Sequence, residues 1–263
     1  ASALAVDVAA PEDARVQAVE LLALTRFSDC GERLVGLLEQ SQPQAVQLAA
    51  IRTLGRFQEA AVGRELASRW PALTPRLREA VLPVLLARPE RILELLRQVE
   101  AGVVRRTDLP STQLDFLMNH REAGIRAESV RLLAGRVTSD RQQVVERFLS
   151  ALDLAGDAGR GKALFNERCA SCHRLGSEGY VLGPDLVSVR NAGREKMLVN
   201  ILDPSREVLP QYLAFEIETR DDESLLGIVA GEAASGVALR QAYGKETVVP
   251  RATIASMQSR GKS

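Results

Sequence analysis

Aromatic residues are scarce in this chain, which has six Phe, three Tyr and one Trp among 263 residues. Most of the core volume must therefore come from Leu, Val and Ala, and this composition favours helix-on-helix packing over a β-sandwich. The charges cancel, with 34 basic and 34 acidic side chains, and we find no basic cluster interleaved with aromatics. We therefore expect no nucleic-acid partner and no polybasic contact with a membrane. No apolar run approaches the ~18 residues that span a bilayer.

Cysteine and histidine are also rare, at three and two residues. Cys169 and Cys172 are close in sequence whereas Cys30 is remote, so the cysteines do not indicate a disulfide framework. Cys30 is expected to be a small buried hydrophobe in a helix. The first basic residue is Arg15, so the N-terminus is not an intact signal peptide. Either a leader has been removed or the chain belongs to a longer protein.

Residues 11–155 have the apolar spacing of a run of short helices, and they contain an internal repeat. Arg15–Phe27 aligns with Ala45–Phe57 at an offset of thirty residues, and Ile125–Val137 matches the second copy loosely. Paired helices that repeat at about this length stack into a solenoid, because no single pair can bury its own apolar face. This segment resembles HEAT-like repeats, and an irregular helical bundle is the alternative.

The composition changes at Gly156–Gly161, where three glycines predict a hinge, and a short amphipathic helix over Lys162–Arg168 follows. Further on the apolar period changes to two, which predicts a small antiparallel β insertion at about residues 212–250. The predicted strands are Leu213–Thr219, Ser224–Ala230 and Val237–Ala242. We therefore expect a mostly α fold in two domains, a helical repeat domain over 1–155 and a second helical domain over 156–263.

Cys169-Ala170-Ser171-Cys172-His173 is the C-x-x-C-H pattern of covalent haem attachment. Two thiols one helical turn apart can add to the two vinyl groups at one edge of a porphyrin. The histidine that follows then lies under the ring, where its imidazole can reach the iron as the proximal ligand. The pattern predicts one covalently bound haem c, held by Cys169, Cys172 and His173.

Other uses of these residues stay open from the pattern alone. A zinc site needs four ligands, and Cys30 and His120 are the remaining Cys and His, so two remote segments would have to converge. A thioredoxin-like redox pair is expected after a βαβ unit, whereas the segment before Cys169 is predicted to be all helical. A pair of structural thiols is the third alternative.

The flanks of the motif resemble those of a cytochrome c domain. The stretch from Gly161 to Phe165 resembles the G-x-x-x-F that opens such a domain, and Gly183-Pro184-Asp185-Leu186 resembles its G-P-x-L segment. The resemblance implies that Phe165, Pro184 and Leu186 belong to the haem site. It also implies that the Pro184 carbonyl accepts a hydrogen bond from the proximal imidazole, which fixes the ring and raises its basicity.

These motifs, followed by Ile201–Ser205, Tyr212 and a strand-rich stretch, resemble the haem-binding C-terminal domain of planctomycetes and verrucomicrobia, the PVC-type cytochrome c domain. In that family the domain often follows HEAT-like repeats and, in longer chains, a β-propeller similar to sugar or alcohol dehydrogenases. The resemblance covers residues 156–263 and, loosely, the repeats. In one departure, the family's usual Asp-Gly hairpin is Asp221-Asp222-Glu223 here.

The same family has a Ser-x-Met-Pro motif after the β insertion, and its Met is implied to be the distal iron ligand. This sequence stops at Ser263, about where that motif should begin, so we expect the natural distal Met beyond it. The iron would then be five-coordinate, or bound by a substitute. Met257 lies a few residues early and lacks the proline, and Met197 lies on a predicted helix before the insertion. Both are kept as substitute distal ligands.

These features predict an electron-transfer module whose iron cycles between Fe(II) and Fe(III). Its expected partners are a dehydrogenase, as a domain or a separate protein, and a further electron carrier. No Ser/His/Asp arrangement, phosphate loop or acid–base dyad is present, so independent catalysis is not expected. Haem c is attached outside the cytoplasm in bacteria, which implies a periplasmic or other extracytoplasmic location.

Two further functions stay as alternatives. The first is a haem-bearing scaffold, in which the repeats dock a protein partner and an open iron senses a diatomic ligand or a redox change. The second is a peroxidase-like enzyme, which needs a distal acid–base residue. His120 is the remaining histidine for that role, and it precedes the repeat copy at Ile125.

Overall fold

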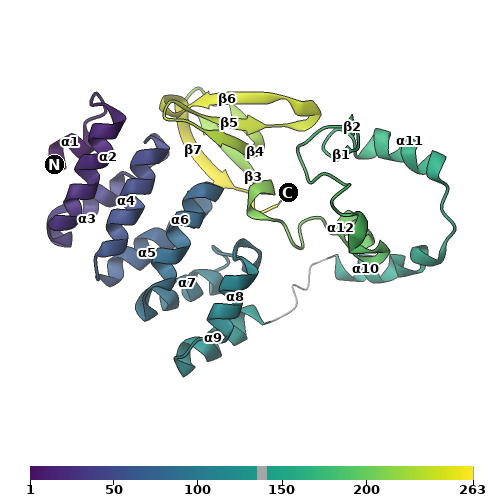
Figure 1. Cartoon of the computed structure of the whole chain (residues 1–263), viewed down its shortest axis with the longest axis horizontal. Helices are drawn as coiled ribbons and strands as arrows, with labels where there is room; N and C mark the ends of the chain where they lie inside the picture. Colours follow the sequence, from purple (N-terminus) through teal and green to yellow (C-terminus); the bar gives the residue numbers. More distant parts are fainter. Residues whose placement is uncertain (135–140, 263) are drawn as a thin grey trace.

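The structure, a computed structural model, describes residues 1–134 and 141–262. The fold is mostly helical and carries a five-stranded antiparallel sheet towards the C-terminus, so the predicted fold class is confirmed at this level (Figure 1). Within the described residues, no helix combines the length and the apolar character that a membrane span needs.

Residues 1–134 form an array of short helices. Their bounds are α1 (Ser2–Val6), α2 (Glu12–Leu21), α3 (Phe27–Gly36), α4 (Gln44–Arg56), α5 (Ala60–Ser68), α6 (Pro75–Leu86), α7 (Pro89–Glu100), α8 (Ser111–Met118) and α9 (Ala123–Leu133). Helices α2, α4 and α6 pack in succession, and α5, α7 and α9 form a second row (Figure 1). Their buried Leu, Val, Ile and Ala side chains make one continuous core.

The first two copies of the internal repeat fall on neighbouring helices of one row of this array, whereas the third falls in the second row. The copies at Arg15–Phe27 and Ala45–Phe57 fall on α2 and α4. Their last residues, Phe27 and Phe57, pack edge to face with ring centroids 5.5 Å apart. The third copy falls on α9, and its residues 135–137 lie outside the described residues. The stacked rows agree with a repeat architecture, and the description as a HEAT-like solenoid remains a prediction.

Further helices flank the C-x-x-C-H motif. They are α10 (Gln142–Phe148), the 3-10 helix η4 (Leu149–Asp153), α11 (Ala158–Arg168) and α12 (Arg194–Leu202). Both α10 and η4 precede the motif in the sequence, and both pack against α12, which follows it. The domain boundary at residues 155 and 156 remains a prediction, and this packing favours a boundary before Gln142.

The glycine-rich stretch before the motif is helical. Asp157 caps α11, because its carboxylate accepts a hydrogen bond of 2.8 Å from the N–H of Arg160. The helix therefore begins before the predicted start at Lys162. The predicted hinge is wrong at Gly159 and Gly161, which lie within this helix.

The sheet has the strand order β6-β5-β4-β3-β7, and every pair is antiparallel. Its strands are β3 (Ala214–Thr219), β4 (Ser224–Glu232), β5 (Gly236–Arg240), β6 (Glu246–Pro250) and β7 (Ile254–Ser259). The predicted end of the β region near residue 250 is wrong, because β7 pairs along β3 and extends to Ser259. The buried residues of β7, Ile254 and Met257, are three positions apart, so the alternation that marks a half-buried strand is missing.

The sheet is docked on the helical array. Phe215 on β3 is fully buried, and the guanidinium of Arg78 from α6 lies 5.5 Å from its ring centroid and 5.3 Å from that of Trp70. Burial lowers the pKa of Arg78 to about 10, although the nearby carboxylate of Asp108 acts in the opposite direction. Arg78 thus stays charged at neutral pH while it is enclosed between helices and sheet.

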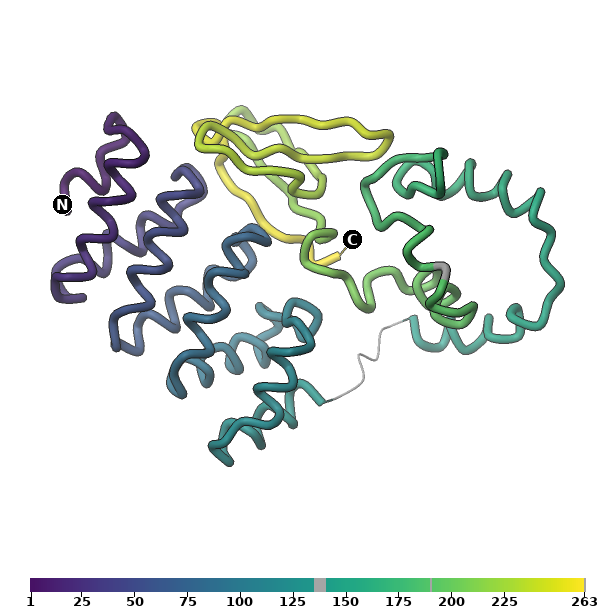
Figure 2. The backbone as a smooth tube through the Cα atoms, viewed as in Figure 1, coloured from purple at the N-terminus to yellow at the C-terminus, as the bar shows by residue number. Residues whose placement is uncertain are grey.

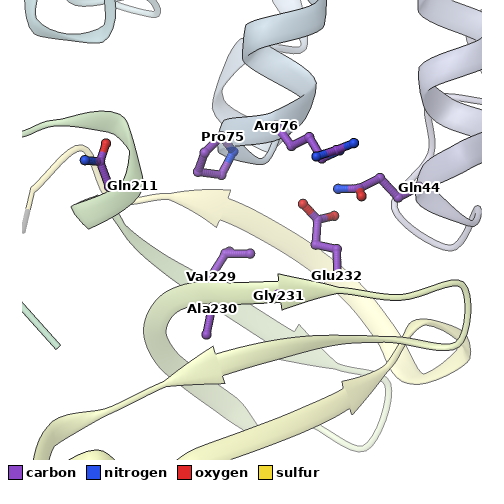
Figure 3. Close-up of a pocket in the computed structure, with 8 residues that line it drawn as sticks. All are labelled: Gln44, Pro75, Arg76, Gln211, Val229, Ala230, Gly231 and Glu232. Carbon is purple, nitrogen blue, oxygen red and sulfur yellow. The ribbon is translucent and has the colours of Figure 1, made fainter. Parts of the chain in front are cut away.

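A second contact lies near the end of α3. Arg251 donates to the carbonyl of Gln40 at 2.9 Å and forms a buried ion pair of 2.9 Å with Glu232. Gln40 in turn donates to the carbonyl of Met257. A hollow of about 270 Å³ remains between helices and sheet, lined by Gln44, Pro75, Arg76, Gln211 and Val229–Glu232 (Figure 3). The sheet is therefore joined to the helical array by buried apolar and polar contacts.

Replacing Phe215 by Ala is expected to lower the free energy of unfolding by about 3–5 kcal/mol, because a fully buried ring and its contact with Arg78 are lost. Urea unfolding followed by circular dichroism measures this change. Leu226 on β4 is the matched control. It is 55% exposed, so Leu226→Ala should change the free energy by no more than about 0.5 kcal/mol. Equal effects of the two substitutions would show that Phe215 does not dock the sheet.

Candidate haem-binding site

The C-x-x-C-H turn follows directly from helix α11. The amide N–H groups of Cys169 and Ala170 both donate to the carbonyl of Phe165, at 2.8 and 2.9 Å, and so end the helix. The N–H groups of Cys172 and His173 donate to the carbonyl of Cys169, at 3.0 and 2.8 Å. This tight turn holds two free, half-buried thiols and the imidazole within five residues of chain.

The imidazole of His173 is oriented by the segment that follows. Its Nδ1 lies 2.9 Å from the carbonyl oxygen of Pro184. Since a carbonyl can only accept, Nδ1 carries the proton and the lone pair of Nε2 is left for a metal. This is the contact that the resemblance to cytochrome c implies. Gly183 permits it, because a Cβ at that position would lie 2.4 Å from Cε1 of the His173 ring.

A short hairpin returns the chain to the turn. Its two strands are β1 (Arg174–Leu175) and β2 (Glu178–Gly179). Gly179 has a φ of +85°, and a Cβ there would lie 2.1 Å from the carbonyl oxygen of His173, so a side chain would displace the turn. The N–H groups of Leu182 and Gly183 then donate to the carbonyl of Cys172, at 2.9 and 2.8 Å.

Asp185 fixes the loop after the proline. One carboxylate oxygen accepts from the N–H of Val187 at 2.9 Å, and the other forms an ion pair of 2.7 Å with Arg174. The backbone hydrogen bond and then the guanidinium lower the pKa of Asp185 below its usual value. Leu186, the last residue of the predicted site, donates its N–H to the carbonyl of Arg174 at 2.8 Å. The loop is thereby tied to the residue next to the histidine.

The segment around this turn has almost no core of its own. From residue 146 to residue 202, no residue whose burial the structure describes is buried. Phe165 and Leu186 are half-buried. Large apolar side chains are instead exposed, namely Leu164, Leu175, Tyr180, Val181, Val187, Met197 and Ile201. A hollow of about 310 Å³ lies beside α11, lined by Ala158, Gly161, Lys162, Phe165, Leu175 and Glu178.

These residues fit a haem. Two free thiols lie in one turn, the imidazole keeps Nε2 available, and the exposed apolar side chains lack a surface to cover them. Among the described residues, no group of three or more His, Cys, Asp and Glu side chains could hold a metal ion. A haem iron needs a single protein nitrogen on its proximal side, because the porphyrin supplies four others.

The residues that a zinc site, a peroxidase-like site or a distal methionine ligand would need lie elsewhere in the structure. Cys30 is buried in α3, and His120 is buried after α8, with its Nδ1 accepting from the N–H of Glu122. The structure does not bring these two to the C-x-x-C-H turn. Met257 is 1% exposed on β7 among the apolar residues of the sheet, so it is not brought to the turn either. Met197 is 40% exposed on α12.

Known proteins resemble this part of the chain. Residues 158–206 match the cytochrome c family. This segment is a cytochrome c domain. A protein named "Cytochrome c-553-like" from Synechocystis sp. is 34% identical over 62 residues, which are 23% of this chain and 58% of that relative. The chain thus spans little more than half the length of the curated relative. A cytochrome c domain implies a covalently bound haem c with its iron, and haem-based electron transfer.

Three residues that shape this part of the chain were not predicted from the sequence, namely Asp157, Gly179 and Asp185. An Asp directly before an amphipathic helix is an N-cap signal, so Asp157 was there to be found. The other two carry no such signal. Gly179 is needed because the chain folds back against His173, and Asp185 because a loop places it beside Arg174.

Acidification is expected to loosen the loop through Asp185. Because its pKa is lowered on folding, its stabilising effect is complete above the usual carboxyl pKa of about 3.9 and is lost as the pH falls through the lowered value. The chemical shift of the Val187 amide, followed by NMR from neutral to acid pH, reports this loss. In Asp185→Asn the same amide should not titrate. A midpoint at or above the usual value in the parent protein would contradict the pairing.

Proposed function

We propose that this chain is a c-type cytochrome electron-transfer module, with one haem c attached to Cys169 and Cys172 and with His173 as the proximal iron ligand. The observation that carries this proposal is the 2.9 Å hydrogen bond from His173 Nδ1 to the Pro184 carbonyl, since it leaves Nε2 free in the turn that also carries the two cysteines. The cytochrome c match over residues 158–206 supports the same function.

A haem c bound here supplies one-electron chemistry between Fe(II) and Fe(III). The residues of the chain hold and orient it. The Pro184 carbonyl accepts the Nδ1 proton of His173, which fixes the imidazole and raises the basicity of Nε2. Phe165 and Leu186, both half-buried, are the proposed apolar contacts that keep water from the ring. This chain alone is proposed not to turn over a substrate.

The partners and the location follow from the resemblance to the PVC-type domain. We propose that electrons come from a dehydrogenase, as a further domain or a separate protein, and pass to a second carrier. The two rows of helices over residues 1–134 are proposed to be a HEAT-like solenoid that docks a protein partner. Because haem c is attached outside the bacterial cytoplasm, the proposed location is periplasmic or otherwise extracytoplasmic.

A haem-bearing sensor is the second function that an observation favours. Met257 lies in the core of the sheet, so the distal side of the iron would not receive that thioether. An iron without a strong distal ligand binds carbon monoxide readily. A reduced spectrum that shifts on adding carbon monoxide supports the sensor, and an unchanged spectrum supports pure electron transfer.

Expression together with a haem-maturation system is expected to raise the intact mass of the chain by one haem. The double variant Cys169→Ala/Cys172→Ala, made in the same cells, should keep the apoprotein mass, because both attachment thiols are gone. His173→Ala should lose normal ligation but keep its helical circular dichroism, because the helices of residues 1–134 have their own core. An unchanged mass of the parent chain under these conditions would refute covalent attachment.

Met257→Ala is expected to leave the visible spectrum of the haem protein unchanged while lowering the free energy of unfolding by about 2–5 kcal/mol, because its side chain is buried in the sheet. Met197→Ala is the matched variant on an exposed position of α12. Loss of a sulfur-to-iron absorption band in Met257→Ala would overturn its placement away from the iron. Loss of that band in Met197→Ala alone would identify Met197 as the distal ligand.

A further inference from the structure

The hairpin between β5 and β6 reaches from the sheet to the attachment turn, Cys169–His173 (Figures 1 and 2). At its tip the N–H of Tyr243 donates to the carbonyl of Ser171 at 2.8 Å. At the end of β5, Nη1 of Arg240 donates to the carbonyl of Val181 at 3.4 Å. Ser171 stands between the two cysteines of the motif, so the hairpin contacts the centre of the turn.

The tip of the hairpin has an unusual backbone. Tyr243 has a φ of +60° and a ψ of +24°, a left-handed conformation that is unfavourable for a residue other than glycine. Gly244 follows with a φ of +70°, and a Cβ there would lie 2.9 Å from the ring of Tyr180. Asn or Gly at position 243 would form the same turn with less strain. The turn geometry alone therefore does not account for a tyrosine.

Tyr180 completes the contact from the other side. Its N–H donates to the carbonyl of Ala170 at 3.0 Å, and its ring meets that of Tyr243 edge to face, with centroids 6.0 Å apart at 75°. Tyr180 and Tyr243 remain 44% and 71% exposed, so they are not part of a buried core. Two adjacent carbonyls of the turn, Ala170 and Ser171, are thus held by residues whose rings touch.

The sheet is the well-packed partner in this contact. Phe215 packs against Arg78, and Arg251 donates a hydrogen bond to the carbonyl of Gln40, so the sheet is fixed to the helical array. The side chains of Phe215, Arg78 and Arg251 are buried. The segment that carries the turn has no described buried residue from 146 to 202. The hairpin therefore links a well-packed element to a poorly packed one.

We propose that the β5–β6 hairpin positions the haem-attachment turn, with Tyr243 as the positioning residue. This inference rests on the proposed haem attachment at Cys169 and Cys172. The N–H of Tyr243 fixes the Ser171 carbonyl, and the ring of Tyr243 packs against that of Tyr180, whose N–H holds the Ala170 carbonyl. The hairpin thereby restrains the turn and limits the access of water to the haem edge, and this exposure is one of the factors that set a haem's reduction potential.

Three variants of the haem-bearing chain test the contact. Tyr243→Pro removes the N–H donor and forbids a positive φ. Tyr243→Asn keeps the donor and tolerates the left-handed conformation but removes the ring. Asp222→Pro is the matched control, because Asp222 has a φ of +61° in the β3–β4 turn and donates its N–H to Thr219. Gly244→Ala replaces Tyr243→Pro if the proline variant does not fold, since its Cβ would displace the Tyr180 ring.

Hydrogen–deuterium exchange and the reduction potential are the two measurements. In Tyr243→Pro the amides of Leu182 and Gly183, which donate to Cys172, should exchange at least about fivefold faster than in the parent. The reduction potential should fall, because water reaches the haem edge. In Tyr243→Asn the exchange at these amides should stay as in the parent. In Asp222→Pro both quantities should stay as in the parent.

The proposal is overturned if Tyr243→Pro leaves exchange at these amides unchanged, or if Asp222→Pro accelerates it equally. Faster exchange with an unchanged potential overturns it too, because the hairpin would then support the fold without affecting the haem. The intact mass of each sample separates this result from a failure of haem attachment. A parent chain without haem contradicts the proposed function, whereas exchange in that apoprotein still tests the hairpin contact.

Discussion

The attachment turn lies in a stretch of chain without a buried residue among those whose burial the structure describes, and this constraint governs the cytochrome c part of the structure. From 146 to 202 no described residue is buried, so the turn is held by hydrogen bonds and close backbone approaches. The imidazole of His173 is oriented by the Pro184 carbonyl, and Gly183 leaves room for the ring because it has no side chain. Such contacts set geometry but bury little apolar surface, and burial is the main source of stability. In the proposed function the haem provides that surface.

The helical array and the sheet, in contrast, each have an apolar core. Residues 1–134 share one continuous apolar core, and the sheet adds a second, smaller one around Phe215. Two arginines are buried where the sheet meets the helices. Arg78 lies between two aromatic rings, and Arg251 pairs with Glu232. Because a buried charge is costly without partners, these contacts specify how the two parts fit as much as they stabilise them.

Charge around the site is balanced by local pairs. Lys162 pairs with Glu178 at 2.6 Å, and Arg174 pairs with Asp185 at 2.7 Å. The carboxyl pKa values of Glu178 and Asp185 are both lowered, by the Lys162 hydrogen bond in the first case and by a backbone N–H in the second. Exposed pairs of this kind add little stability, so their effect is to orient the loop and α11 around the turn. The site is thus arranged by hydrogen bonds rather than by a strong field of one sign.

The C-x-x-C-H motif and the amphipathic helices of the repeat could be predicted from the amino-acid sequence, because short spacings within one turn or helix set them. The resemblance to a cytochrome c domain implied the contact between His173 and Pro184. Contacts between distant segments became apparent only in the folded chain. β7 pairs along β3, Met257 enters the core of the sheet, and Tyr243 meets Ser171 across more than seventy positions of chain. No local pattern carries such contacts, since they arise from how whole elements pack and from which strand edge is left to be paired.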